Sequence, residues 1–182
     1  MFTFSLKKSF LKRAVCMGLA VCLLAVFLTG CNNGTIDDDV NKPGTLPVIL
    51  VGKWANYDEY IIKTEIIEGK EEHTIGYLMN DDEWPFEYKG TIRFVSNYNS
   101  SSGIIIIEYT NNLFSDPNKP FTGIYYRDLT STTVKLANAI NLNDNYSSAD
   151  TATLEEAIKK FTLGRMGNYI DWSVVTPYNK VP

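Results

Sequence analysis

The sequence is poor in cysteine and histidine, and both shortages narrow the chemistry open to the chain. It holds three cysteines and one histidine in 182 residues. Cys16 and Cys22 fall in an apolar N-terminal segment, and Cys31 is the last cysteine along the chain. The part of the chain after Cys31 therefore contains no cysteine. A disulfide in the folded part, a zinc site built on thiolates and a cysteine nucleophile are therefore not expected. His73, the only histidine, leaves no second candidate for a multi-histidine site or a Ser-His-Asp arrangement.

Positive charge is also in short supply. The chain carries 17 lysines and arginines against 21 acidic residues, for a net charge of −4. Four of the basic residues lie before residue 14, so a chain that begins at Cys31 keeps 13 basic residues and has a net charge of −8. A nucleic-acid partner is therefore not expected. Glycine-rich phosphate loops are absent too, and we expect no cofactor.

The N-terminus, by contrast, has the features of a lipoprotein signal. Basic residues precede an uncharged apolar run at 14–28, which ends in the sequence Leu-Thr-Gly-Cys at 28–31. This segment resembles the lipobox of bacterial lipoprotein precursors, which implies cleavage between Gly30 and Cys31 and a diacylglycerol on the Cys31 thiol. The alternative is a retained membrane span, which needs about 20 apolar residues, more than this run provides. We interpret 1–30 as a signal peptide.

The signal predicts where the protein resides and how the chain is divided. We expect a lipid anchor that holds the protein to a bacterial membrane, because the attached acyl chains together give durable binding. Position 32 is asparagine and not the aspartate that retains some lipoproteins in the inner membrane, which favours the outer membrane. The stretch 31–46, with a triple aspartate at 37–39, is typical of a flexible acidic tether. The remainder, 47–182, is long enough for one domain with its own core.

Short segments with strand periodicity fill most of this domain. At 86–95 the even-numbered apolar residues from Phe86 to Phe94 share one face, which indicates a half-buried strand. Four consecutive isoleucines at 104–107 favour a strand that is covered on both faces. The predicted strands are 52–54, 60–66, 73–79, 86–95, 104–109, 121–129, 132–140 and 168–175.

One segment near the C-terminus reads as a helix. Thr153 and Glu156 have the spacing of a capping box, and Gly164 marks the expected end. About eight strands and one late helix predict an all-β protein with a closed, or nearly closed, antiparallel barrel. A β-sandwich is the competing architecture.

The tripeptide Gly-Lys-Trp at 52–54, together with a helix just before the last strand, resembles the lipocalin-like, calycin-type barrel. In that family an arginine stacks on the tryptophan, which implies Arg127 or Arg165 over Trp54. The chain also resembles small spirochaete-type lipoproteins with a lipocalin-like barrel. That second resemblance implies the fold and the anchor but no assigned activity. It rests on the sequences Gly-Thr-Ile-Arg-Phe-Val-Ser-Asn at 90–97, Gly-Ile-Ile-Ile-Ile-Glu-Tyr at 103–109, Gly-Ile-Tyr-Tyr-Arg-Asp-Leu at 123–129 and Ala-Thr-Leu-Glu-Glu-Ala at 152–157.

The inventory of catalytic side chains is sparse, and we expect no enzyme and no metal site. We interpret His73 as an ordinary surface residue, because it lies in a polar hairpin beside glutamates. Acidic pairs such as Asp58 with Glu59 have the residue types for glycoside hydrolysis, but acidic loops are far more often simply solvated.

Aromatic residues are the one feature that invites a binding hypothesis. They supply apolar area with a polar tip, which suits a ligand pocket, although aromatic residues are also ordinary components of a strand core. Our first hypothesis is a binding protein for a small apolar or amphipathic ligand, which requires a cavity of about 300 Å³ or more. The second is an adhesin-like module that meets an envelope or host protein through the loops at 81–84 and 111–120. The candidate ligand-binding residues are Trp54, Tyr60, Tyr88, Tyr109 and Tyr126.

Overall fold

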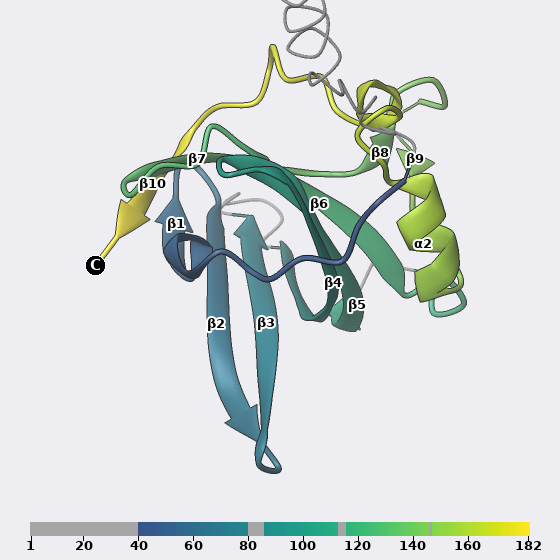
Figure 1. Cartoon of the computed structure of the whole chain (residues 1–182). Coiled ribbons are helices and arrows are strands. Elements are labelled where there is room, and N and C mark those ends of the chain that lie inside the picture. The colour runs from purple at the N-terminus through teal and green to yellow at the C-terminus, as the bar shows by residue number, and fades with distance from the viewer. Residues whose placement is uncertain (1–39, 80–85, 113–115, 146) are drawn as a thin grey trace, which may run out of the picture. The chain divides into compact units, whose positions relative to one another are not determined.

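The computed structural model describes residues 40–79, 86–112, 116–145 and 147–182 (Figure 1). The chain divides into a unit at 1–37 and a unit at 38–182, and all described residues belong to the second. The predicted signal peptide, the cleavage site and Cys31 lie outside the described residues.

A closed antiparallel barrel forms the body of this second unit. Around the barrel the strand order is β1-β10-β7-β6-β5-β4-β3-β2, and β8 pairs with β9 in a separate small sheet. This arrangement confirms the predicted barrel and rules out the sandwich. The strands are β1 Gly52–Ala55, β2 Glu59–Ile67, β3 Lys70–Met79, β4 Phe86–Asn99, β5 Ser102–Asn112, β6 Phe121–Arg127, β7 Thr133–Asn138, β8 Ile140–Asn141, β9 Ser147–Ser148 and β10 Tyr178–Val181.

The turn between β2 and β3 follows from its sequence. Glu68 and Gly69 both have positive φ, at 50° and 76°. A two-residue hairpin turn of this hand matches the right-handed twist of the strands, and glycine at the second position meets no steric penalty. The predicted hairpin is therefore confirmed, with Ile67 opposite Lys70.

A β-bulge in β4 changes which residues face the barrel interior. Ile92 pairs with Ile107, but Phe94 pairs with Ile106, so Arg93 is an extra residue on this strand. After the bulge Val95 joins the interior cluster, whereas Phe94 packs in a second cluster outside the barrel. The single apolar face predicted from Phe86 to Phe94 is therefore wrong beyond Ile92, because one inserted residue reverses the alternation.

The four isoleucines of β5 are covered on both sides, as predicted. Ile105 and Ile107 belong to the interior cluster, and Ile104 and Ile106 lie in the outer cluster with Phe161. All four are fully buried. The outer cluster therefore fixes the helical segment against the barrel wall.

That helix, α2 (Leu154–Lys160), begins with the predicted capping box. Thr153 Oγ1 accepts a hydrogen bond from the Glu156 amide at 3.2 Å, and the Glu156 carboxylate accepts one from the Thr153 amide at 3.2 Å. The helix ends at Lys160, with Phe161 as its C-cap, before the predicted Gly164. Asn41 Nδ2 donates to the carbonyl oxygens of Ile158 and Phe161 at 2.8 and 2.7 Å, which satisfies acceptors that the helix end leaves open.

The predicted last strand at 168–175 is wrong. Short 3₁₀-helices occur at Val48–Leu50 (η1) and Met166–Asn168 (η2), the second at the start of the predicted strand. The Asp171 carboxylate then accepts hydrogen bonds from the amide and hydroxyl of Ser173 at 2.9 and 2.6 Å, which holds a turn. β10, after Pro177, is the strand that closes the barrel between β1 and β7.

The N-terminal boundary of the domain also needs correction. Asn41 is buried against α2, Gly44 donates its amide to Val95 O at 2.8 Å, and Leu46 packs in the interior cluster. Residues 41–46 are thus part of the folded domain rather than of a flexible tether, because their polar and apolar groups find partners on it. The rest of the predicted tether, 31–39, lies outside the described residues.

Candidate functional site

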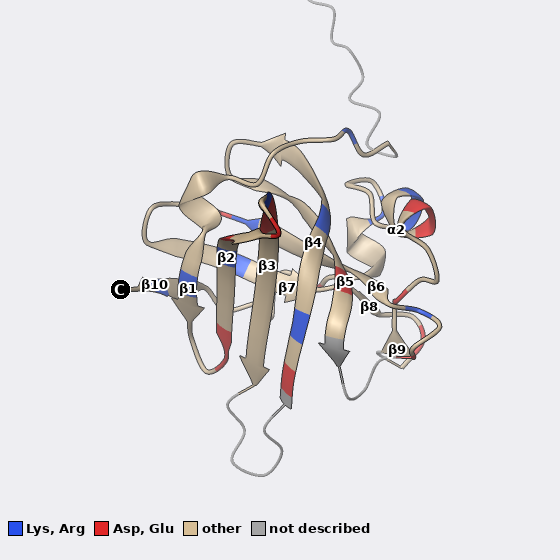
Figure 2. Cartoon of the chain, turned by 90° about the horizontal axis from the view of Figure 1, so that it is seen from below, with Lys and Arg blue, Asp and Glu red and all other residues tan. Residues whose placement is uncertain are grey.

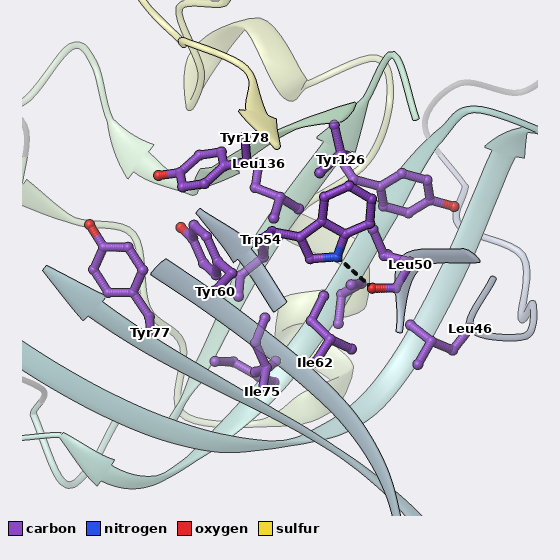
Figure 3. Packing of buried hydrophobic residues seen from close by; sticks show 14 of the residues in the cluster. Leu46, Leu50, Trp54, Tyr60, Ile62, Ile75, Tyr77, Tyr126, Leu136 and Tyr178 are labelled. Carbon is purple, nitrogen blue, oxygen red and sulfur yellow. Dashed lines mark hydrogen bonds between the residues drawn. The ribbon is translucent and has the colours of Figure 1, made fainter. Parts of the chain in front are cut away.

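Trp54 closes one part of the barrel interior (Figure 3). Its side chain is fully buried, and its indole Nε1 donates a hydrogen bond to Leu50 O at 2.8 Å. Lys180 Nζ lies 5.0 Å from the centre of the indole ring and donates to Ile49 O at 2.8 Å. The indole is therefore held by both η1 and β10 and cannot turn toward a ligand without breaking these contacts.

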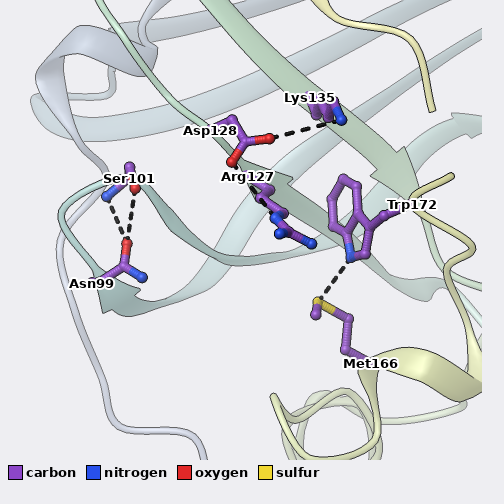
Figure 4. A network of polar contacts seen from close by, with 7 residues as sticks. All are labelled: Asn99, Ser101, Arg127, Asp128, Lys135, Met166 and Trp172. Atoms are coloured by element: carbon purple, nitrogen blue, oxygen red, sulfur yellow. Dashed lines mark hydrogen bonds and ion pairs between the residues drawn. The ribbon is translucent and has the colours of Figure 1, made fainter.

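The arginine expected over Trp54 is not the residue found there. Lys180 supplies the cation at Trp54. Arg127 instead lies over Trp172, with its guanidinium carbon 5.9 Å from the ring centre, and Trp172 Nε1 donates to the sulfur of Met166 at 3.3 Å (Figure 4). β6 ends in an exposed position at Arg127, outside the barrel interior, so the side chain meets the C-terminal segment.

Tyrosine rings fill another part of the interior. Tyr77 packs on Tyr60 and Tyr88 with ring centres 4.6 and 5.0 Å away, and Tyr88 packs edge-on against Tyr109 at 5.3 Å. The hydroxyls of Tyr60 and Tyr88 both donate to Asn138 Oδ1, at 3.2 and 2.8 Å. Burial raises the pKa of Tyr60 and of Tyr88 well above the usual tyrosine value, so both stay neutral donors.

Tyr126 occupies a third part of the interior. Its hydroxyl donates to Asn97 Oδ1 at 2.6 Å, and Asn97 Nδ2 donates in turn to Thr45 O at 2.9 Å. Burial raises the pKa of Tyr126 to about 12. These bonds join β6, β4 and the N-terminal segment of the domain.

The predicted ligand-binding aromatics thus share the barrel interior, but they contact one another and the core. Trp54, Tyr60, Tyr88 and Tyr126 are no more than 2% exposed, and Tyr109 packs against the same cluster. None of the five lines either of the two cavities described next. Their role in ligand binding stays a prediction, and their packing explains the stability of the barrel.

A cavity of about 720 Å³ lies where β3 and β4 separate. β3 pairs with β4 only from Thr74 onward, opposite Thr91, while β4 continues to Asn99 along β5. Residues 43–48 run along the freed part of β4 and form the other wall. We name this space the seam cavity. Its apolar lining includes Leu46, Val48, Val51, Ile92, Phe94 and Val95.

Polar groups gather at one side of the seam cavity. Thr64 Oγ1 and His73 Nδ1 lie 2.9 Å apart in hydrogen-bond contact, and His73 Nε2 is 4.0 Å from the Glu71 carboxylate. Arg93, at the bulge, also lines the cavity and donates its Nε to Glu108 at 2.7 Å. An apolar wall beside a few hydrogen-bonding groups is the pattern of small-molecule sites. The His73 side chain is 32% exposed and lines the cavity, and its interpretation as an ordinary surface residue stays a prediction.

The seam cavity escaped prediction because residues far apart in sequence form it. Segment 43–48, β2, β3 and the bulged part of β4 each contribute. The position of the bulge decides that Val95 joins the interior cluster, and strand periodicity alone does not reveal a bulge. Recognition that residues 41–46 belong to the folded domain would have indicated one wall of the cavity.

A second, smaller hollow of about 470 Å³ lies on the outer face of β2, β3 and β4. Ile61 and Leu78 line it beside Gly76, which pairs with Ile61 and has no side chain to fill the space. Glu59, Glu87 and Lys89 surround these residues. We name it the outer groove. Its charged rim and smaller volume make it the weaker candidate for an apolar ligand.

Two searches within the described residues bear on other functions. Among them, no group of three or more His, Cys, Asp or Glu side chains is placed to hold a metal ion. No helix in the described ranges is both long enough and apolar enough to cross a membrane.

No family model, no curated protein and no solved structure matches this chain.

Proposed function

We propose that this protein is a lipid-anchored, non-catalytic binding protein of the bacterial cell envelope, whose barrel takes up a small apolar or amphipathic ligand. The observation that carries the proposal is the seam cavity, whose volume of about 720 Å³ lies within the range of small-molecule sites. The lipobox at 28–31 supports the anchor, Asn32 supports the outer membrane, and the resemblance to spirochaete-type lipoproteins supports both the anchor and the barrel.

The lining of the cavity indicates how such a ligand binds. The apolar part of the ligand packs against Ile92, Val95 and Leu46, which removes hydrocarbon surface from water. The polar end of the ligand lies at Thr64 and His73, whose hydroxyl and imidazole both donate and accept hydrogen bonds. An amphipathic molecule with a short polar head satisfies both regions at once.

The test uses a fluorescent polyene fatty acid, cis-parinaric acid, as the probe. Ile92→Trp fills part of the seam cavity, because Ile92 is half-buried in its wall. Ile61→Trp is the matched control, since Ile61 is equally half-buried but lines the outer groove. We expect Ile92→Trp to weaken probe binding about tenfold, which equals the loss of about 1.4 kcal/mol, and Ile61→Trp to leave it unchanged.

Two results would count against the site. Probe binding that neither tryptophan alters would place the ligand elsewhere. Weakening by Ile61→Trp but not by Ile92→Trp would move the site to the outer groove. Circular dichroism of both variants establishes that the barrel is intact before binding is compared.

A further inference from the structure

One wall of the seam cavity is a segment that belongs to no helix or strand. Residues 41–46 precede η1, and four of them, 43–46, line the cavity. Figure 1 shows this segment, in dark blue, running from α2 to η1. We name residues 41–46 the strap. Because residues 42–45 are also exposed, this part of the wall lies between the cavity and the solvent.

The strap is firmly fixed at its C-terminal end. Leu46 packs in the interior cluster, and the chain continues into η1. There Leu50 is fully buried, and its carbonyl oxygen accepts the hydrogen bond of the Trp54 indole. Any motion of the strap is therefore expected to pivot near Pro47 and to be largest at Asn41.

Few contacts hold the middle of the strap. The Gly44 amide donates to Val95 O at 2.8 Å, and this is the one backbone hydrogen bond between the strap and a strand in the described part of the chain. Asn97 Nδ2 adds a bond to Thr45 O at 2.9 Å. Lys42 is the only charged residue of the strap, the rest of which is tan in Figure 2, and it forms no ion pair with any described residue. A segment with so few contacts opens more readily than paired strands.

Asn41 holds the N-terminal end of the strap. Its side chain is 8% exposed, and Nδ2 donates to the carbonyl oxygens of Ile158 and Phe161 at 2.8 and 2.7 Å. Its Oδ1 accepts a bond from the Tyr98 hydroxyl at 3.4 Å. The net contribution of such bonds is small, because water replaces them when the groups separate. Asn41 therefore keeps the strap closed in most molecules and leaves an open form as a minor state.

The aromatic core closes the other way into the seam cavity. Trp54, Tyr60 and Tyr126 fill the barrel interior and are no more than 2% exposed. Val51 and Val95, which line the cavity, pack against this same cluster. A ligand that moved through the interior would have to displace these rings and break their hydrogen bonds. Passage beside the strap breaks fewer contacts.

We propose that the strap is a gate, which Asn41 holds shut against α2 and which moves away from β4 to admit or release the ligand. This inference rests on the proposed function, since it takes the seam cavity as the ligand site. The open form leaves the barrel intact, because the strap belongs to no strand and Leu46 and η1 stay in place.

A pair of cysteines can lock the gate reversibly. A Cβ at Gly44 lies 3.3 Å from Asn97 Cγ, a separation that suits a disulfide between cysteines at these two positions. The chain after Cys31 contains no other cysteine. The double variant, Gly44→Cys with Asn97→Cys, is compared with itself in oxidised and reduced form. The loss of the Asn97 hydrogen bonds is then common to both forms.

Asn41→Asp makes the opposite change and opens the gate. At about pH 8 its carboxylate faces the carbonyl oxygens of Ile158 and Phe161 and donates to neither. Asn99→Asp is the matched control, because it adds the same charge at an exposed position. There the side-chain oxygen accepts hydrogen bonds from Ser101, which aspartate also does.

The measurement is the rate at which bound probe leaves the protein. The full chain is placed in vesicles of zwitterionic phosphatidylcholine and loaded with cis-parinaric acid, and an excess of protein-free vesicles then takes up the released probe. Energy transfer from tryptophan follows the bound fraction. We expect release to be about tenfold slower in the oxidised than in the reduced double variant. Asn41→Asp should release the probe about tenfold faster than the wild-type chain, and Asn99→Asp within about twofold of it.

Hydrogen exchange provides a second measurement that needs no ligand. The amides at 44–46 should exchange faster in Asn41→Asp than in the wild-type chain and in Asn99→Asp. Circular dichroism checks that each variant keeps the barrel, and if Asn41→Asp unfolds, the two redox forms decide alone.

The gate and the proposed function fail in different ways. Equal release from the oxidised and reduced forms would overturn the gate, and so would a folded Asn41→Asp variant that matches the wild-type chain in release and in exchange. If Ile92→Trp still weakens the probe in that case, the seam cavity stands and only the gate is wrong. A wild-type chain that binds no probe would remove the site and the gate together.

Discussion

Glu65 of β2 and Glu72 of β3 occupy directly opposed positions in the two-stranded arm that these strands form at 63–73, beyond their pairing with β1 and β4. Directly opposed residues lie on the same face of the two strands, so two negative side chains meet with no strand on either outer side to stabilise them. A charge change at either position should therefore alter the local stability of the arm.

We predict that Glu72→Lys stabilises the arm by about 0.5 to 1 kcal/mol, because it replaces a like-charge pair by an ion pair. Amide hydrogen exchange at 63–67 and 70–73 measures the effect directly. Glu72→Gln, which removes the repulsion without adding an attraction, should give an intermediate change. Faster exchange in Glu72→Lys than in the wild-type chain would show that the opposed carboxylates do not control the arm.

Gly103 and Gly76 offer a second contrast, between a closed and an open glycine site. A Cβ at Gly103 would lie 2.5 Å from the Tyr126 hydroxyl and would also meet the carbonyl oxygen of Ser96. A Cβ at Gly76 meets nothing within 4 Å. Gly103→Ala should therefore destabilise the fold by about 2 to 3 kcal/mol, and Gly76→Ala should stabilise it slightly, since alanine restricts the unfolded chain. Urea unfolding of the two variants checks both signs, and a Gly103→Ala variant as stable as the wild type contradicts the tight packing described.

Trp54→Phe tests the closure of the interior by the indole. The change leaves Leu50 O without its 2.8 Å hydrogen bond and opens space in a fully buried site. We expect a loss of about 2 to 3 kcal/mol in the free energy of unfolding. Trp172→Phe, at a half-buried site where the indole bonds only a sulfur, should cost less than about 1 kcal/mol. Similar losses in the two variants would mean that Trp54 has no special structural role.

The buried tyrosines predict instability at alkaline pH. Burial raises the pKa of Tyr126 to about 12 and, with a contribution from Asp58, that of Tyr178 to about 12, against an ordinary value of 10.0. The folded state therefore retains protons that the unfolded state releases above about pH 10. Stability from these groups should be complete below that pH and should decline steadily toward pH 12.

Tyrosinate absorbance, titrated alongside circular dichroism, measures this effect. Tyr126 and Tyr178 should ionise only as the barrel unfolds, because burial raises the pKa of both. Ionisation of all tyrosines in one transition, with the circular dichroism unchanged, would contradict the burial of the ring cluster.

Much of the barrel was predictable because short-range chemistry determines it. The turn at Glu68 and Gly69, the capping box of Thr153 with Glu156 and the isoleucines at 104–107 each have one favourable local structure, and the chain adopts it. The turn sets the pairing of β2 with β3, and the capping box sets where α2 begins.

The errors in the sequence-based predictions arose where distant parts of the chain decide the outcome. The bulge at Arg93 depends on how β4 fits against β5, and the turn at Asp171 replaced an apparent strand. Asn41 belongs to the domain because it meets carbonyl groups of α2, more than a hundred residues away in sequence. The seam cavity combines two of these features, and for that reason sequence periodicity did not locate it.

Intact mass spectrometry of the full chain, made in a bacterium that processes lipoproteins, tests the central claim most directly. We predict a chain that begins at Cys31 and carries diacylglycerol, with a small apolar or amphipathic molecule released from the same sample on denaturation. Cys31→Ser should yield an uncut chain without the lipid. A wild-type chain that keeps residues 1–30, carries no lipid and releases no bound molecule would contradict both the anchor and the binding function.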